Sequence, residues 1–194
     1  YDFTTAQLAE KAGMDMLLVG DSLGMAVYGY SGTVPVTLDQ SMYHTEAVRR
    51  GAPNTFIIGD MPFGSYHGSV NDAVQNAVQY HKKCGVDCIK LEGGVRVAHI
   101  IRAIADSGML VMGHVGLTPQ STGALGGFKA QGRSAESAMA IMDDAQAVYE
   151  AGAFAMLVEA VPPEVARMIA QELPIPIYGI GAGADCDGQV MIVS

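Results

Sequence analysis

The sequence predicts a parallel β/α barrel of eight strands that is incomplete over these 194 residues. Short apolar runs alternate with amphipathic helical segments along the chain. The runs are apolar at successive positions, which is typical of strands buried on both faces of a parallel sheet that helices cover. Ionisable residues or glycines end nearly every run. A barrel brings all its strand ends to one mouth, whereas an open sheet gathers ligands at one switch point, so we favour the barrel.

Glycines that can adopt the left-handed conformation separate most of the expected helices from the strands that follow them. In the last unit, Pro174 and Pro176 end the helix instead. Eight strands close such a barrel, so the last strand and most of the first should lie outside this chain, with a possible remnant at Tyr1-Asp2. We expect residues 1–194 to form a single catalytic barrel domain, truncated at both ends. The six expected strands are 16–19, 56–58, 88–91, 110–112, 155–158 and 177–180.

Composition excludes several classes of partner. Hydrophobic residues make up 49% of the chain and charged residues 16%, which is typical of a globular domain. The formal net charge is -9 and basic runs are short, so the chain lacks the footprint for a nucleic acid backbone. No apolar run reaches the roughly 18 residues that a membrane helix needs. The three cysteines favour reduced thiols, packed in the interior, and a cytoplasmic location.

Three carboxylates, Asp21, Asp60 and Glu92, end three successive expected strands. In a barrel they would converge and repel one another unless a cation neutralised them. Oxygen ligands without cysteine or histidine suit Mg²⁺. The alternative for each aspartate is that it caps the following helix. We also expect Asp60→Ala to leave the fold largely intact, because a metal ligand at a strand end is not a core residue.

Three further ionisable residues belong to the same mouth. Lys90 lies two residues before Glu92, so both face the same side of the strand. It could bind a substrate carboxylate or a developing enolate oxygen, or form a salt bridge with the carboxylates. Glu159 lies outside the carboxylate trio and is a candidate general base, or else a structural carboxylate. His114 either polarises a substrate oxygen or is simply hydrogen-bonded in the mouth.

Nine segments of the chain carry a shared pattern, and these are 19–25, 43–45, 48–53, 60–63, 89–94, 113–120, 126–129, 131–133 and 177–183. As an ordered set they resemble the ketopantoate hydroxymethyltransferase family along nearly all of the chain. The resemblance implies a (β/α)8 TIM barrel of the phosphoenolpyruvate/pyruvate type, and family members are typically cytoplasmic homodecamers. The family chains run on at both ends, where folate contacts cannot be assigned.

The resemblance also implies an activity and residue roles. The reaction adds a one-carbon unit from 5,10-methylenetetrahydrofolate to 3-methyl-2-oxobutanoate and gives 2-dehydropantoate, on the way to pantothenate and coenzyme A. Mg²⁺ would be held by Asp21, Asp60 and Glu92, directly or through water. The oxo acid would contact Ser22, Asp60 and Lys90, and we place Asp21 and His114 beside it as well. Glu159 would be the base.

The expected mechanism forms an enolate. The oxo acid chelates Mg²⁺, Glu159 removes the C3 proton, and the enolate, held by the metal and Lys90, attacks the folate methylene carbon. One alternative is a magnesium-dependent lyase or mutase of the isocitrate lyase/phosphoenolpyruvate mutase type, which usually carries a reactive cysteine in a mobile loop. Another is a barrel kept as a scaffold, against which the retained acids, Lys90 and Glu159 argue.

Overall fold

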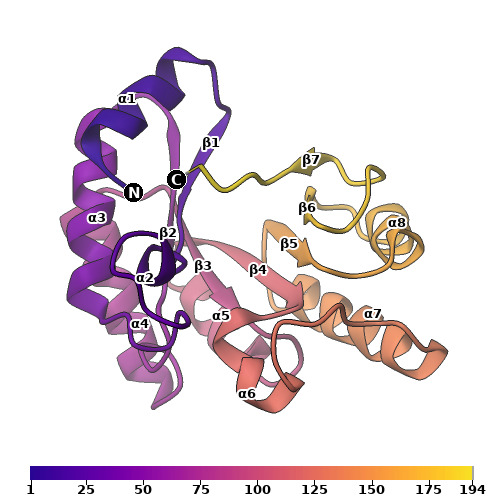
Figure 1. Ribbon diagram of the computed structural model, residues 1–194. Coiled ribbons are helices and arrows are strands. Elements are labelled where there is room, and N and C mark those ends of the chain that lie inside the picture. The colour runs from indigo at the N-terminus through magenta and orange to yellow at the C-terminus, as the bar shows by residue number, and fades with distance from the viewer. Residues whose placement is uncertain (194) are drawn as a thin grey trace. The chain divides into compact units, whose positions relative to one another are not determined.

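The computed structural model describes residues 1–193 and divides them into two compact units. The first unit holds residues 1–91 and 106–110, and the second holds residues 92–105 and 111–193. Within each unit, every strand pair is parallel and follows the order of the chain (Figure 1). Among the described residues, no helix has the length and apolar character needed to cross a membrane. That the two units work as one catalytic domain stays a prediction.

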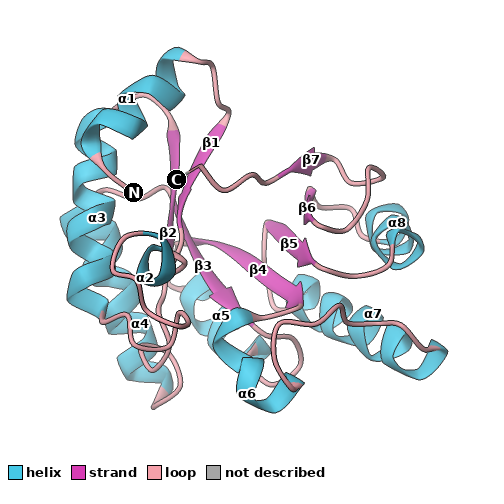
Figure 2. Cartoon of the chain, viewed as in Figure 1, coloured by secondary structure: helices cyan, strands magenta, loops and turns pink. Residues whose placement is uncertain are grey.

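The first unit is built on strands β1, β2 and β3, with β2 in the centre. Helices α1, α3 and α4 lie beside β1 and β2 (Figure 2). The ladder pairs Val19 with Gly59 and Asp60 with Lys90, so successive strands end at one edge. The elements are α1 (Phe3–Lys11), β1 (Met16–Val19), α2 (Leu23–Ala26), α3 (Leu38–Gly51), β2 (Phe56–Asp60), α4 (Val70–Gln79), a π-helical turn η1 (Tyr80–Cys84) and β3 (Cys88–Glu92), whose last residue belongs to the second unit.

Local sequence explains the longest helix of the first unit. Thr37 and Gln40 form a capping box at the start of α3, each side chain accepting a backbone N–H of the other residue. Arg49 and Arg50 occupy the last turn, where cations interact favourably with the helix dipole. Gly51 is the last residue of the helix, and a Cβ there would lie 2.4 Å from the carbonyl oxygen of Phe3. The glycine thus lets α1 pack closely against α3.

The second unit continues the alternation with strands β4, β5, β6 and β7, paired in that order. The ladder places Gly116 opposite Glu159, and Glu159 opposite Ile180. The last residue of α5 and the first residue of β4 belong to the first unit. The elements are α5 (Ala98–Asp106), β4 (Leu110–Gly116), a 3-10 turn η2 (Pro119–Ser121), α6 (Thr122–Leu125), α7 (Ala135–Glu150), β5 (Ala155–Glu159), α8 (Pro163–Glu172), β6 (Ile177–Ile180) and β7 (Gly188–Gln189).

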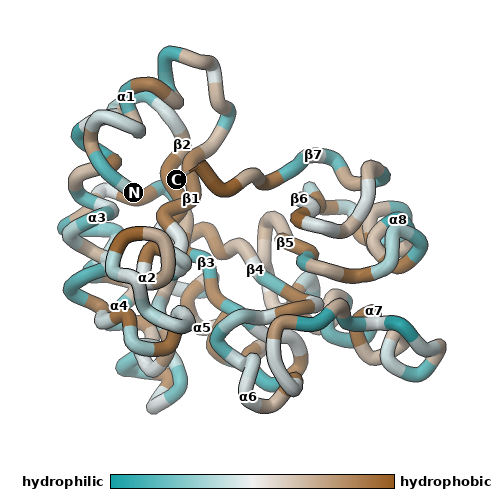
Figure 3. Tube along the Cα trace, in the orientation of Figure 1, coloured by the Kyte–Doolittle hydropathy of each residue, from teal (hydrophilic) through white to brown (hydrophobic). Residues whose placement is uncertain are grey.

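The core of each unit runs along its strands. Ile57 and Ile89 are buried in the first unit, and Val111 and Met156 in the second. Figure 3 shows the hydrophobic colour along β1 and β2 and mixed polarity along the helices. All five residues of β3 are buried, as expected for a strand covered on both faces. The predicted incomplete parallel barrel is therefore confirmed in its strand type and order.

Two expectations about the ends of the chain need correction. Tyr1-Asp2 is not a strand remnant, because Asp2 is the N-cap of α1 and its carboxylate accepts the N–H of Thr5 at 2.9 Å. A seventh strand, β7, follows the six predicted ones, and no apolar run in the sequence predicts it. The residue before it, Asp187, accepts the N–H of Ile177 at 2.8 Å. Asp87, directly before β3, accepts the N–H of Ile57 in the same way.

Candidate active site

The predicted site residues form two clusters, one in each unit. The Asp60 cluster of the first unit comprises Asp21, Ser22, Asp60 and Lys90. The His114 cluster of the second unit comprises Glu92, His114 and Glu159. Asp60, Glu92, His114 and Glu159 lie within strands β2 to β5 and not after them, because the ladders extend farther than the apolar runs.

Asp60 is hydrogen-bonded through all three of its oxygens. It is the last residue of β2 and only 1% exposed. Its Oδ1 accepts from Nζ of Lys90 and its Oδ2 from the backbone N–H of Asp21, both at 2.9 Å. Its carbonyl oxygen accepts from the hydroxyls of Tyr80 at 2.8 Å and Ser41 at 3.2 Å. Asp60 is therefore held in one orientation, and its carboxylate directions are preorganised.

The ion pair of Lys90 with Asp60 is part of the core. Both side chains are at most 3% exposed, and the β2–β3 register places the two residues opposite each other. The predicted salt bridge of Lys90 is thus present. Removing one partner of such a pair leaves an uncompensated buried charge, which is strongly destabilising. This contradicts the expectation that Asp60→Ala leaves the fold largely intact.

Ser22 stands where β1 turns into α2. It occupies the N-cap position of this short helix but makes no side-chain cap. Its Oγ instead shares a hydrogen bond of 2.7 Å with the hydroxyl of Tyr1. Burial, together with the charges of Asp21 and Asp60, raises the pKa of Tyr1. The serine hydroxyl is therefore tied to a second hydroxyl beside the two carboxylates.

His114 lies in β4 between two carboxylates and is only 1% exposed. Its Nε2 stands 3.2 Å from Oε2 of Glu159, and its Nδ1 stands 3.6 Å from Oε1 of Glu92. Neither approach has hydrogen-bond geometry, so both ring nitrogens lack a hydrogen-bond partner among the described residues. An unsatisfied buried polar group costs about 1–3 kcal/mol, and one that persists in a native structure is a candidate functional group.

The two glutamates of the His114 cluster differ in access. Glu92 is buried, and its Oε2 accepts the backbone N–H of Gln120 at 2.9 Å. The side chain of Glu159 is 20% exposed, so it can reach a bound molecule. The Glu159 carbonyl accepts from the backbone N–H of Leu117 at 2.8 Å. Gly116 makes this approach possible, because a Cβ there would come 2.4 Å from the same carbonyl oxygen.

The backbone directly after Glu159 is strained. Ala160 has φ +48°, the one positive φ of a non-glycine residue in the described part of the chain. Its N–H donates to the carbonyl of Ile180 and its carbonyl accepts from the N–H of Gln131, both at 2.9 Å. These two bonds hold Ala160 in a conformation that alanine rarely adopts. Such strain is commonly found next to functional residues.

The donor set suits a hard cation. Within residues 1–193, no three His, Cys, Asp or Glu side chains are grouped as a ready metal site. Mg²⁺, however, is commonly held by one or two carboxylates together with water and substrate oxygens. Asp21 and Asp60 supply carboxylates within one unit. Each carboxylate oxygen of Asp60 accepts one of the hydrogen bonds described above and has a second lone pair, so the residues fit the ion.

Several residues of these clusters carry no sequence motif. Tyr1, Ser41 and Tyr80 join the site through hydrogen bonds to it, and only their place in the fold reveals them. Gln120 lies in the family-like segment 113–120, but its bond to Glu92 was not predicted. Burial raises the pKa of Tyr80 well above its usual value, so it remains a hydrogen-bond donor.

All three cysteines are free thiols, and Cys84 and Cys88 are buried. Burial raises the pKa of Cys84 to about 12 and also raises that of Cys186. Neither thiol has the depressed pKa that a reactive cysteine requires. The prediction of packing cysteines therefore agrees with the structure for Cys84 and Cys88, whereas Cys186 is only half-buried.

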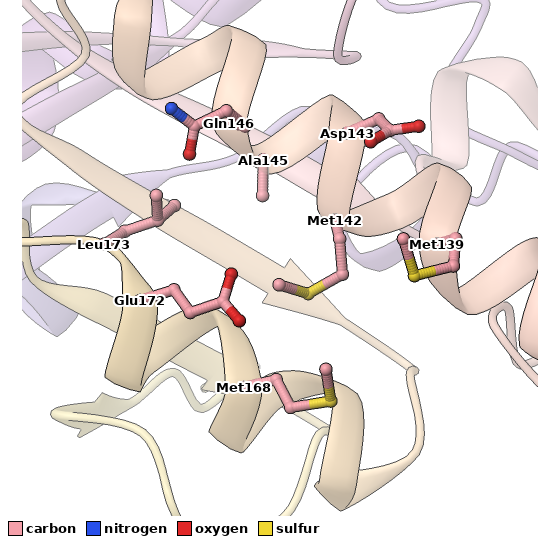
Figure 4. Close-up of a pocket in the computed structure, with 8 residues that line it drawn as sticks. All are labelled: Met139, Met142, Asp143, Ala145, Gln146, Met168, Glu172 and Leu173. Carbon is pink, nitrogen blue, oxygen red and sulfur yellow. The ribbon is translucent and has the colours of Figure 1, made fainter.

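A separate hollow of about 220 Å³ lies between α7 and α8 of the second unit (Figure 4). Met142 of α7 and Met168 of α8 line it, with Asp143 and Glu172 also in its wall. It contains none of the predicted site residues, and its lining offers no convergent set of catalytic groups. We therefore place the chemistry at the strand ends and not in this hollow.

Comparisons with known proteins agree with the geometry. The profile of the ketopantoate hydroxymethyltransferase family matches residues 1–194. A 3-methyl-2-oxobutanoate hydroxymethyltransferase from Alkaliphilus metalliredigens is 65% identical over 192 residues, which are 99% of this chain and 68% of that protein. The enzyme of the same name from Geobacillus kaustophilus is 54% identical, over 99% of this chain and 69% of that protein.

Solved structures show the same fold at low identity. Phosphonopyruvate hydrolase in complex with oxalate and Mg²⁺ is similar with a TM-score of 0.69 and 16% identity, over 92% of this chain and 64% of that one. The 2,3-dimethylmalate lyase, a member of the PEP mutase/isocitrate lyase superfamily, is similar with a TM-score of 0.66 and 20% identity, over 92% of this chain and 62% of that one. The chain thus spans less than two thirds of these two solved chains. On its sequence, the chain belongs to the ketopantoate hydroxymethyltransferase family, built on an incomplete barrel of the kind seen in that superfamily.

Proposed function

We propose that this chain carries the catalytic residues of a 3-methyl-2-oxobutanoate hydroxymethyltransferase. The enzyme would transfer a hydroxymethyl group from 5,10-methylenetetrahydrofolate to 3-methyl-2-oxobutanoate and release 2-dehydropantoate. The names of relatives at 65% and 54% identity support the reaction. The observation that carries the proposal is the position of Glu159, a partly exposed carboxylate at a strand end, beside the buried ring of His114. Backbone hydrogen bonds hold this strand end: the Glu159 carbonyl accepts from Leu117, and the N–H of the next residue, Ala160, donates to Ile180.

Binding of the oxo acid falls to the Asp60 cluster. The Ser22 hydroxyl and the Lys90 ammonium would donate to its oxygens, with Asp21 and His114 lining the site. Lys90 is buried, and its bond of 2.9 Å to Oδ1 of Asp60 holds the ammonium in this cluster. Asp21 and Asp60, with Glu92, would hold Mg²⁺. When bound, this ion supplies positive charge to the keto oxygen and makes the adjacent C–H more acidic.

Glu159 then performs the proton transfer. Its carboxylate accepts the C3 proton of the oxo acid, and the electron pair of that C–H bond becomes the enolate. Lys90 and His114 would each offer N–H donors to the developing negative charge. Water adds to the methylene carbon of the opened folate iminium, and the C–N bond of that adduct then breaks, so that tetrahydrofolate leaves and the one-carbon unit remains as formaldehyde. The enolate carbon forms a bond to this carbon, the electrons of the C=O π bond move to oxygen, and a proton completes the hydroxymethyl group. The chain's own contribution is orientation and preorganised charge.

Two further expectations belong to the same proposal. We propose a cytoplasmic homodecamer, as is typical of the family. Light scattering after gel filtration measures the mass directly, and a stable monomer would contradict this part of the proposal.

One experiment tests the function. 3-Methyl-2-oxobutanoate is incubated with the protein in D₂O, and exchange of the C3 proton is followed by NMR with and without Mg²⁺ and with and without 5,10-methylenetetrahydrofolate. We expect metal-dependent exchange without folate, and 2-dehydropantoate only when folate is present. Exchange that requires folate would overturn the stepwise order, and absence of product with both substrates present would overturn the function.

The fold likeness to 2,3-dimethylmalate lyase keeps a second candidate, a magnesium-dependent lyase or mutase. Such an enzyme would turn over an acid substrate without folate. The high identity to hydroxymethyltransferases argues against it. The folate-free arm of the experiment separates the two candidates.

A further inference from the structure

Four residues of the first unit form a chain of hydrogen bonds that ends at Ser22. The hydroxyl of Tyr28 bonds Nε2 of His44 at 3.1 Å. Nδ1 of the same ring bonds the backbone carbonyl of Tyr1 at 2.6 Å. The Tyr1 hydroxyl bonds Oγ of Ser22 at 2.7 Å. A histidine of helix α3 is thus linked through Tyr1 to a residue of the Asp60 cluster.

Elementary donor rules fix the directions of the first two bonds. A carbonyl oxygen only accepts, so Nδ1 of His44 must carry a hydrogen and donate it to Tyr1. In the neutral ring, Nε2 then accepts from the Tyr28 hydroxyl. The next residue, Asp2, caps helix α1. Tyr1 is therefore anchored by its own carbonyl and by the start of a helix, which gives its ring a defined position.

The last bond of the chain decides where the Ser22 hydrogen goes. The Tyr1 phenol carries a hydrogen that it can donate, and the geometry of the 2.7 Å bond allows either hydroxyl to be the donor. If Tyr1 donates to Ser22, the Ser22 oxygen accepts that bond. The hydrogen of the Ser22 hydroxyl can then point away from Tyr1, toward another acceptor. Ser22 does not use its side chain to cap α2. A bound anion beside the Asp60 cluster is the acceptor that this arrangement fits.

We propose that Tyr1 is a positioning residue that donates to Ser22 and thereby directs the Ser22 hydrogen toward a carboxylate oxygen of the bound oxo acid. This inference rests on the proposed function, because it takes Ser22 to be a substrate contact. Tyr1 does not touch the reacting carbon in this scheme. His44 acts one step farther away, by holding the backbone of Tyr1.

The test begins with Tyr1→Phe, which keeps the ring and removes the hydroxyl. We expect KM for 3-methyl-2-oxobutanoate to rise about two- to tenfold, the effect of losing one hydrogen bond, with a smaller change in kcat. Tyr43→Phe is the matched control, because Tyr43 is an exposed tyrosine of the same helix as His44. An unchanged KM in Tyr1→Phe, with the control also unchanged, would overturn the inference.

A double-mutant cycle shows whether Tyr1 acts through Ser22. Ser22→Ala should raise KM at least as much as Tyr1→Phe, and adding Tyr1→Phe to Ser22→Ala should change KM no further. A full, additive effect of Tyr1→Phe in the Ser22→Ala background would mean that Tyr1 acts by another route. Thermal unfolding of each variant checks that the fold is kept, so that a loss of affinity is not a loss of folded protein.

A second pair of variants tests the anchor. The side-chain amide of Asn can place an N–H close to the position of Nδ1, so His44→Asn should raise KM less than His44→Ala does. The reverse ranking would overturn the role of His44. Calorimetry of the wild-type protein with the oxo acid separates the two levels of failure. If wild type binds no oxo acid, the proposed function fails; if it binds while Tyr1→Phe binds equally well, only the inference fails.

Discussion

The Asp60 cluster and the His114 cluster satisfy their polar groups to different degrees. Every oxygen of Asp60 accepts a hydrogen bond, and its carboxylate pairs with Lys90 in the interior. His114 is equally buried, yet neither ring nitrogen is hydrogen-bonded among the described residues. The first cluster holds fixed charges in fixed directions, whereas the second keeps donors and acceptors that a substrate can engage. Fixed charges suit the binding of a substrate, whereas proton transfer requires a donor or acceptor that is not already hydrogen-bonded.

The difference also separates stability from activity. A fully bonded buried pair stabilises the fold only while both partners remain, so its loss should be felt in folding. An unsatisfied histidine and a strained residue after Glu159 both reduce stability, as is common beside functional residues. Substitutions in the Asp60 cluster should therefore act on unfolding as well as activity. Those in the His114 cluster should act mainly on activity.

The largest effect is expected from Asp60→Ala. It strands the Lys90 charge in the interior, so the free energy of unfolding should fall by about 3–5 kcal/mol and activity should vanish. Urea unfolding gives the first quantity and the exchange assay the second. Asp39→Ala, which removes an exposed carboxylate in the first turn of α3, is the control and should change stability by less than about 1 kcal/mol. If Asp60→Ala were as stable as wild type, the Asp60 cluster would not differ from the His114 cluster in its contribution to stability.

Glu159→Gln should act on chemistry alone. The amide keeps the shape of the side chain but cannot accept the C3 proton, so exchange in D₂O should slow by about 10²–10⁴-fold while the oxo acid still binds. Glu164→Gln, an exposed glutamate at the start of α8, serves as the control. Exchange at the wild-type rate would assign the base to another residue.

His114→Met tests whether the unsatisfied ring reduces stability. Methionine fills a similar space without polar nitrogens, and removing a buried unsatisfied group recovers about 1–3 kcal/mol, which offsets imperfect packing. We expect the free energy of unfolding to stay within about 1 kcal/mol of wild type while affinity for the oxo acid falls. His99→Met, on the exposed surface of α5, is the reference. A loss above about 3 kcal/mol would show that the ring is held by interactions as strong as those of Asp60.

The smallest effect concerns the strained backbone after Glu159. Ala160→Gly removes the penalty of a left-handed alanine, and the greater freedom of glycine in the unfolded chain offsets part of the gain, so we expect a net gain of about 0.5 kcal/mol. Gly181→Ala, at φ +60° with room for a Cβ, should lose about 1 kcal/mol. Both values come from urea unfolding. A destabilised Ala160→Gly would mean that Ala160 is not strained.

Much of the fold could be predicted from the sequence. The six apolar runs became strands, and the left-handed glycines Gly13, Gly85 and Gly152 precede three of them. Both signals are local, since a strand buried on both faces is apolar throughout and a helix end needs a positive φ. Strand β7 was not predicted, because a strand of two residues has no hydropathy pattern. Asp187 acts through a hydrogen bond to Ile177, which cannot be recognised from the sequence.

Of the candidate site, the sequence by itself determined which ionisable residues stand at strand ends, because strand ends are readable from the same apolar runs. Only the tertiary structure decided what those residues do to one another. The pairing of Lys90 with Asp60 follows from the register of β2 and β3. The unsatisfied nitrogens of His114 and the bond from Tyr1 to Ser22 likewise depend on residues far apart in the chain. Hydrogen bonds require distances and angles between such residues, and no local pattern encodes them.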